Sequence, residues 1–443
     1  MKEPDDGRHP SSAASTSGAT AGHNNAGDAT RSVEGPSGPD QRPSQSPSGN
    51  PSNRKRRRNR RRRKQRGEAA APQQSGSASL AVGQPESDAA ATQPPVRPDA
   101  PRLYAALDLG TNNCRLLVAT PTKPGQFRVV DAFSRIVRLG EGFGASGRLS
   151  ENAMDRALEA LKVCSEKLNG KTVRKARLIA TEACRSADNG AAFLERVQEH
   201  TGLELEVVDR ETEARLAVSG CGSLVDRAAK STVLFDIGGG SSEIAVIDLT
   251  DPKSRRLADG IVDWVSLPVG VVTMSEKFGG EHVNAEIFAK MKAYAAELLN
   301  DFAAKHENVG RGDHSFHLIG TSGTVTTLAG IHLDLPRYDR RRVDGLWINA
   351  RQVSEINNRI LNWSFDQRKA NPCIGADRAD LVLAGCAILE AIRDAWPAKR
   401  LRVADRGLRE GLLTEMMSED GAWRSRRRRN NRHRYRSKDT AQS

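Results

Sequence analysis

The 443-residue sequence is poor in the residues that build a hydrophobic core: hydrophobic residues make up 37% and aromatic residues only 4%. The deficit is concentrated in residues 1–100, where Ser, Pro, Gly, Ala, Asn and Gln dominate. Such a segment buries too little apolar surface to offset the entropy lost on ordering. We therefore predict a disordered tail over residues 1–100 and a folded region that begins near residue 101.

Other absences narrow the class of protein. The sequence has no run of about 18 apolar residues and no apolar stretch near its start, so we expect a cytoplasmic protein without membrane association. The six cysteines form no C-x-x-C pair, which is typical of reduced intracellular proteins. A G-x-x-x-x-G-K-[ST] motif is also missing, and this excludes the usual P-loop.

Positive charge is concentrated in two short runs. Residues 54–66 carry 11 positive side chains and residues 424–438 carry 9, so the formal net charge of +13 leaves the rest of the chain at −7. Arginine clusters outside a folded region are typical of polyanion binding, and we expect RNA or another polyanion as their partner. The alternative is that both runs only keep the protein soluble.

Between the tails, the sequence alternates between strand and helix patterns. Residues 103–109 and 114–120 have the apolar character of buried strands, whereas Ser150 caps a predicted amphipathic helix. Residues 231–249 again read as strand, glycine turn and strand, and long predicted helices follow. This alternation predicts a layered α/β fold.

A short internal repeat relates the two halves. Residues 108–115 (DLGTNNCR) and 236–243 (DIGGGSSE) share an Asp, an apolar residue and a Gly, then small or polar residues before a charged one. Glycine has no Cβ to block the approach of a phosphate, and the flanking carboxylates suit magnesium. We predict domains over residues 101–229 and 230–422, with a C-terminal helix able to pack back on the first, and a disordered tail over residues 423–443.

The repeat and a series of further motifs resemble the actin-like phosphotransferase superfamily and, within it, the exopolyphosphatase/guanosine pentaphosphate phosphohydrolase family. The motifs are VRLGEG (137–142), ATEACR (180–185), TEARL (212–216), LPVGVV (267–272), GTSGTVTTLAG (320–330), RADLVLAG (378–385) and GLREGLL (407–413). The resemblance implies an α/β fold of the actin-like, two-domain phosphotransferase type, in which a ribonuclease H-like domain is duplicated. In such a fold the two glycine hairpins face each other across a cleft. It also implies the short form of the family, without a C-terminal HD-type domain.

The resemblance also implies roles for individual residues. Glu213 would be the general base that activates water, Arg185 would line the cleft and supply positive charge to the phosphate during catalysis, and Asp108, Asp236 and Glu243 would hold Mg²⁺. The phosphate-binding residues would be Asp108, Gly110, Thr111, Asn112, Asn113, Arg115, Gly238, Gly239, Gly240, Ser241, Ser242 and Arg409. Two residues depart from the family pattern, Ser322 where glycine is common and Glu182 where a smaller residue is usual, and no role is assigned to either.

The activity implied is magnesium-dependent hydrolysis of terminal phosphates from inorganic polyphosphate, from pppGpp or from both. One alternative is a catalytically weak sensor of these ligands that delivers them to RNA or ribosomes through the basic tails. Another is an actin-like kinase, which the TEARL motif disfavours. The sequence leaves open the preferred substrate, its chain length and the oligomeric state, a homodimer included.

Overall fold

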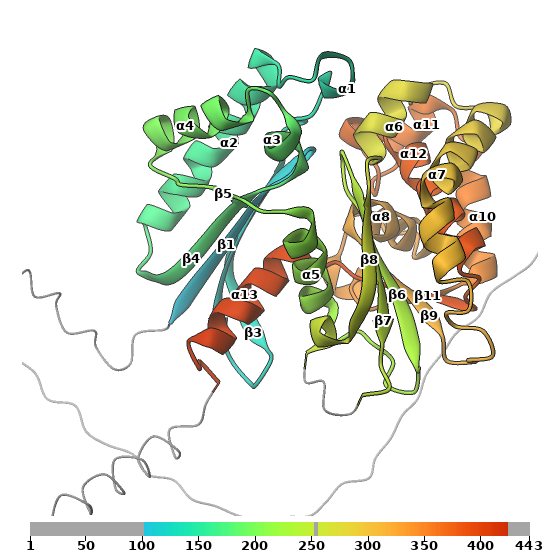
Figure 1. The fold of residues 1–443 in the computed structure, drawn as a ribbon. Coiled ribbons are helices and arrows are strands. Elements are labelled where there is room, and N and C mark those ends of the chain that lie inside the picture. The colour runs from blue at the N-terminus through green and yellow to red at the C-terminus, as the bar shows by residue number, and fades with distance from the viewer. Residues whose placement is uncertain (1–101, 252–255, 424–443) are drawn as a thin grey trace, which may run out of the picture. The chain divides into compact units, whose positions relative to one another are not determined.

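The computed structural model describes residues 102–251 and 256–423, which form two β-sheets with helices around them (Figure 1). The predicted N-terminal tail and both arginine-rich runs lie outside these residues. No helix in the described part of the chain is long and apolar enough to cross a membrane. All six cysteines are buried and none forms a disulfide.

Sheet A has five strands in the order β3-β2-β1-β4-β5. Its strands are β1 (Leu103–Leu109), β2 (Asn113–Pro121), β3 (Phe127–Ile136), β4 (Val173–Ala180) and β5 (Glu206–Val207). The helices of this half are α1 (Phe143–Ser146), α2 (Glu151–Asn169), α3 (Glu182–Ser186), α4 (Gly190–Thr201) and α5 (Arg210–Cys221). The Ser150 hydroxyl accepts a hydrogen bond from Ala153 N at the start of α2, as the sequence predicts.

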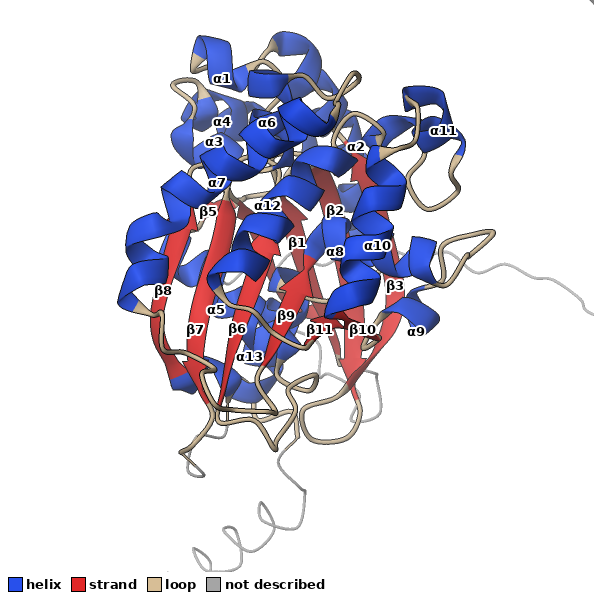
Figure 2. Cartoon of the chain, turned by 90° about the vertical axis from the view of Figure 1, so that its right-hand side faces the viewer, coloured by secondary structure: helices blue, strands red, loops and turns tan. Residues whose placement is uncertain are grey.

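Sheet B has six strands in the order β10-β11-β9-β6-β7-β8. They are β6 (Ser231–Ile237), β7 (Ser242–Asp248), β8 (Ile261–Leu267), β9 (His317–Thr321), β10 (Trp347–Asn349) and β11 (Arg400–Val403). The helices are η1 (Leu257–Gly260), α6 (Val271–Phe278), α7 (Ala285–Lys305), α8 (Ser322–His332), α9 (Arg340–Val343), α10 (Ala350–Leu361), α11 (Phe365–Ala370), η2 (Ala376–Arg378), α12 (Val382–Ala395) and α13 (Leu408–Glu419). Figure 2 shows α7, α8, α10 and α12 over one face of this sheet.

The two sheets repeat one topology. In sheet A, β1 pairs with β2 antiparallel and with β4 parallel, and in sheet B, β6 pairs with β7 antiparallel and with β9 parallel. The register also matches, because Asp108 lies opposite Arg115 and Asp236 lies opposite Glu243. The duplication predicted from the short sequence repeat is therefore confirmed.

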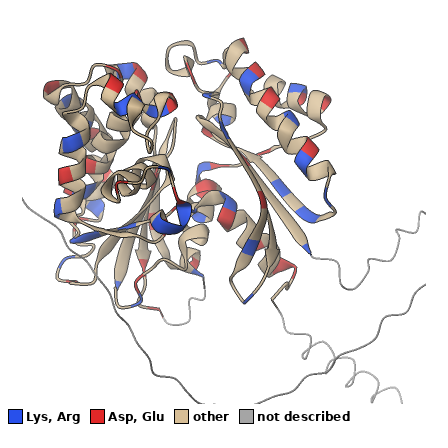
Figure 3. Ribbon diagram, turned by 180° about the vertical axis from the view of Figure 1, so that it is seen from behind, with Lys and Arg blue, Asp and Glu red and all other residues tan. Residues whose placement is uncertain are grey.

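Separate hydrophobic cores support the two sheets. Alternate residues of β1 and β2, such as Leu107 and Leu116, pack with α2 and α4, while β6, β9, α8 and α12 build a larger core around Phe235 and Leu383. Acidic and basic residues are interspersed along the outer helices (Figure 3), partly as i,i+4 pairs such as Glu286–Lys290.

Two crossing helices join the halves. The apolar side of α5 packs against β6 and β7 of sheet B, whereas α13 packs on β1 of sheet A around Leu412 and Met416. The helices approach so closely that a Cβ on Gly220 would lie 2.0 Å from the Gly407 carbonyl oxygen, and one on Gly411 would lie 2.1 Å from the Leu216 carbonyl oxygen. Only glycine fits at these two crossing points.

Candidate active site

The glycine turns of the two repeats face one another across a cleft of about 630 Å³. Gly110 N donates to Asn113 O at 2.9 Å in the first turn, and Gly238 N donates to Ser241 O at 2.9 Å in the second. A Cβ on Gly239 would lie 2.9 Å from Thr111 Cβ, which explains why no larger residue fits there. The turns therefore form opposing walls of a single cleft.

Helix α6 fixes the second turn from behind. Val271 N donates to Gly238 O at 2.9 Å, and Val272 N donates to Gly239 O at 2.8 Å. The backbone N–H groups of Gly239 and Gly240 have no acceptor among the described residues. Because its carbonyl groups are bound on one side, the turn presents hydrogen-bond donors on the other, an arrangement suited to phosphate oxygens.

Four of the carboxylates that line the cleft, Asp108, Asp236, Glu243 and Glu213, are those singled out by the sequence, and burial raises the pKa of each of these four. Burial and the negative charge of Asp108 raise the pKa of Asp236 to about 6. Burial and the charge of Asp236 raise the pKa of Glu243 to about 7, although Ser241 and Ser266 donate to Glu243 at 2.7 and 3.0 Å. A cation or a cluster of donors would relieve this repulsion.

Glu213, in the first turn of α5, is the fourth of these carboxylates. Asp209 caps the helix by accepting from Thr212 N at 2.6 Å, which fixes the turn that carries Glu213. Burial and the nearby charge of Glu243 raise the pKa of Glu213 well above its usual range, while Arg185 opposes that shift at 3.1 Å. A carboxylate with a raised pKa facing a phosphate-binding turn is suited to accept a proton from water.

Arg115 and Arg409 line the cleft, and neither side chain has a hydrogen bond or ion pair within the described ranges. Burial lowers the pKa of Arg409, and the negative charges of Glu410 and Asp108 partly offset this shift. An anion with several oxygens would give both guanidinium groups the partners that the protein does not supply.

Arg185 is differently placed. The structure gives its guanidinium no place in the cleft wall, because Nη1 donates to Glu213 Oε2 at 3.1 Å and to Val208 O at 2.6 Å, and Nη2 donates to Glu182. Ser242 also lies outside the wall, since it is fully buried and donates to Val269 O at 2.7 Å. All the other residues assigned to the site from sequence line the cleft.

The amides of the first turn have unused hydrogen-bonding capacity. The Oδ1 atoms of Asn112 and Asn113 are buried without a partner, and both residues line the cleft. Ser322, the departure at the start of α8, has a φ of 80° and donates to Ile237 O at 2.7 Å. Its hydroxyl also lowers the pKa of Asp236, so Ser322 supports the acidic side of the cleft.

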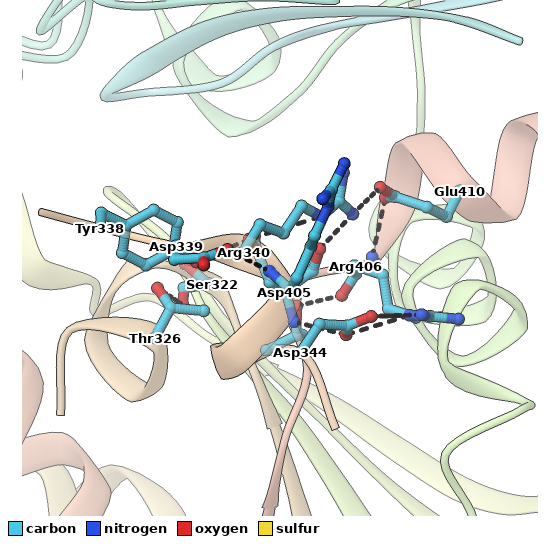
Figure 4. A network of polar contacts seen from close by, with 12 residues as sticks. Ser322, Thr326, Tyr338, Asp339, Arg340, Asp344, Asp405, Arg406 and Glu410 are labelled. Carbon is cyan, nitrogen blue, oxygen red and sulfur yellow. Dashed lines mark hydrogen bonds and ion pairs between the residues drawn. The ribbon is translucent and has the colours of Figure 1, made fainter. Parts of the chain in front are cut away.

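Several residues that line the cleft have no role predicted from sequence. In Figure 4, Arg340 donates to Glu410 at 2.6 Å and lies beside Asp405, which accepts from the Tyr338 hydroxyl at 2.6 Å. Glu410 lies in the motif GLREGLL and Arg378 lies in the motif RADLVLAG. The sequence therefore placed both residues near the site but predicted no role for either. Tyr338 and Arg340 lie between motifs, and nothing in the sequence singles them out.

The acidic residues fit the predicted Mg²⁺. No three His, Cys, Asp or Glu side chains within residues 102–251 and 256–423 are grouped as a metal site. Magnesium, however, usually binds to proteins through one or two carboxylates and takes further ligands from substrate phosphates and water. Asp108 and Asp236, half-buried at the ends of equivalent strands and close enough to interact electrostatically, provide such a partial donor set.

Comparisons with known proteins identify the family of this chain and agree with its fold. The sequence model of the Ppx/GppA phosphatase family matches residues 118–420. A crystal structure of a Ppx/GppA family member from Aquifex aeolicus is similar over 72% of this chain and 98% of its own, with 26% identity and a TM-score of 0.59. An exopolyphosphatase from Cytophaga hutchinsonii, 23% identical, covers the same shares with a TM-score of 0.64 and supports the fold.

Proposed function

Because this chain belongs to the Ppx/GppA phosphatase family, we propose that it releases terminal phosphates from inorganic polyphosphate, from pppGpp or from both. The observation that carries the proposal is that Glu213, both glycine turns and two arginines without protein partners line one cleft. Transfer of a phosphoryl group to water requires three kinds of group: a base, hydrogen-bond donors that hold the phosphate, and positive charge. The cleft contains all three.

In the proposed reaction, the terminal phosphate lies between the two turns. The free N–H groups of Gly239 and Gly240 bind its oxygens, and Arg115 and Arg409 neutralise its charge. Glu213 takes a proton from the attacking water, and Arg185 holds the Glu213 carboxylate in place. Water attacks phosphorus, the bridging oxygen leaves with the shortened chain, and no covalent enzyme intermediate forms.

We propose Mg²⁺ as the cofactor of this reaction. Asp108, Asp236 and Glu243 would hold the ion, directly or through water. When bound, the ion supplies positive charge to the phosphate oxygens and to the crowded carboxylates. The raised pKa values of Asp236 and Glu243 support the assignment, since a nearby cation favours the ionised form of each.

One experiment tests the activity and its rivals: phosphate release measured in parallel on long polyphosphate, tripolyphosphate, pppGpp and ATP, with and without Mg²⁺. We expect release that depends on Mg²⁺ from at least one of the first three substrates. Transfer from ATP to an acceptor without free phosphate would identify a kinase. Tight binding of pppGpp or polyphosphate without turnover would identify a sensor.

We propose a polyanion as the partner of the arginine-rich runs, residues 54–66 and 424–438. The second run begins directly after Trp423, whose indole N–H donates to Gln126 O at 3.1 Å beside β3. The strand β3 also lines the cleft farther along, at residues 132–134 and at Ile136. RNA and long polyphosphate are both ligands with the required charge.

A further inference from the structure

Glu182 is a buried carboxylate to which the proposed mechanism gives no part. It begins α3 immediately after β4, where Thr181 N donates to Leu109 O at 3.2 Å next to the first glycine turn. Its residue is 8% exposed and lines the cleft. A Cβ on Gly240 would lie 3.3 Å from Glu182 Cγ, so Glu182 lies where the second turn meets the first half of the molecule.

Both oxygens of the Glu182 carboxylate accept hydrogen bonds, from three side-chain donors in all. Oε1 accepts from Ser186 Oγ at 2.8 Å and from Arg210 Nη2 at 3.0 Å, and Oε2 accepts from Arg185 Nη2. The other amino group of Arg185 donates to Glu213 at 3.1 Å. One guanidinium therefore joins Glu182 to Glu213.

We propose that Glu182 is a positioning residue for hydrolysis: it anchors Arg185 and Arg210 so that Arg185 holds the Glu213 carboxylate. The inference rests on the proposed function, because it assigns Glu213 the role of base. Without the Glu182 charge, Arg185 loses a partner that holds it out of the cleft, and its guanidinium is free to move toward the phosphate. Glu213 then loses its fixed orientation toward water.

Two other roles for Glu182 agree less well with its contacts. A metal ligand needs free carboxylate lone pairs, yet three side-chain donors already bind these oxygens. A group that repels substrate needs an uncompensated charge, yet two arginines pair with Glu182. Burial would raise the pKa of Glu182, but hydrogen bonds from Ser186 and Arg185 outweigh burial and lower it, which keeps the carboxylate ionised.

A double-mutant cycle tests whether Glu182 acts through Arg185. Glu182→Gln and Arg185→Met are measured singly and together, with tripolyphosphate as substrate and saturating Mg²⁺. We expect Glu182→Gln alone to lower kcat about tenfold to a hundredfold without raising KM, because orientation is lost and not binding. In the Arg185→Met background the same change should alter kcat by less than about twofold.

The control is Glu211→Gln, which removes an exposed carboxylate two residues from Glu213. Thermal unfolding of each variant establishes that it is folded. Equal losses in both backgrounds would show that Glu182 works independently of Arg185. An increased Mg²⁺ requirement would make Glu182 a metal ligand, and a rise in kcat/KM would make it a repelling group; either result overturns the inference. A wild-type protein that hydrolyses none of the substrates would overturn the proposed function itself.

Discussion

Replacing the candidate base, Glu213→Gln, separates its chemical role from its structural one. The amide keeps the shape of the side chain and can still accept the hydrogen bond from Arg185, but it cannot take a proton from water. General-base assistance contributes about two to four orders of magnitude in rate, so kcat should fall by about that factor. This loss corresponds to about 3–5 kcal/mol in the activation free energy. KM should change little, because the phosphate ligands remain.

The same substitution should not destabilise the fold. Burial and the charge of Glu243 raise the folded-state pKa of Glu213, so the unfolded chain loses this proton at a lower pH than the folded one. Ionisation of Glu213 therefore costs stability as the pH rises from its unfolded pKa toward its folded pKa. In EDTA above neutral pH, the glutamine variant should be as stable as the wild type or more stable.

The assays are phosphate release at saturating substrate and Mg²⁺, and thermal unfolding in EDTA at pH 5 and pH 8. Glu211→Gln serves as the control, since its carboxylate lies on the exposed side of the same helix. Nearly normal turnover of the Glu213 variant would remove this residue from the mechanism. A low Tm together with low activity would show that Glu213 supports the structure and that its catalytic role is unproven.

Three further predictions concern metal, packing and the basic runs. Asp236→Asn and Glu243→Gln should each raise the Mg²⁺ concentration needed for half-maximal activity, and unchanged metal titrations would refute their assignment. Gly220→Ala should cost about 1–3 kcal/mol in unfolding free energy because its Cβ would overlap the neighbouring helix, whereas Gly222→Ala, with 3.6 Å of room, serves as the tolerated control. Removing residues 54–66 and 424–438 should flatten the salt dependence of RNA and polyphosphate affinity, and salt-independent binding by the complete protein would contradict an electrostatic interaction.

The sequence predicts the fold well because the signals that define it are local. Each glycine turn lies between two apolar strands, so the strand pairing and the internal repeat can be inferred from a few adjacent residues. The contacts between α5 and α13 are different, because Gly220 and Gly407 are 187 positions apart in the sequence and no local pattern links them. A glycine required by a distant carbonyl cannot be distinguished in sequence from a glycine in an ordinary turn.

For the site, the sequence predicted which residues lie near the cleft better than it predicted the directions of their side chains. The predicted phosphate-binding residues of both turns line the cleft, with the exception of Ser242, whose position at the start of β7 directs its hydroxyl to Val269. Arg185 shows the same limit: its motif places it near the cleft, but Glu182 and Glu213 determine where its guanidinium lies. Glu182 belongs to the same helix as Arg185, but Glu213 comes from a separate segment, and only the folded chain shows the three together.

The duplicated hairpins also bear on the proposal that one cleft both binds phosphate and activates water. At equivalent positions, opposite the shared aspartate, the first repeat carries Arg115 and the second carries Glu243. The first hairpin therefore has a cation beside its aspartate, whereas in the second the charge of Asp236 raises the pKa of Glu243. The exchange of Arg for Glu gives the cleft a basic side and an acidic side, and the proposed binding of phosphate together with Mg²⁺ would use both.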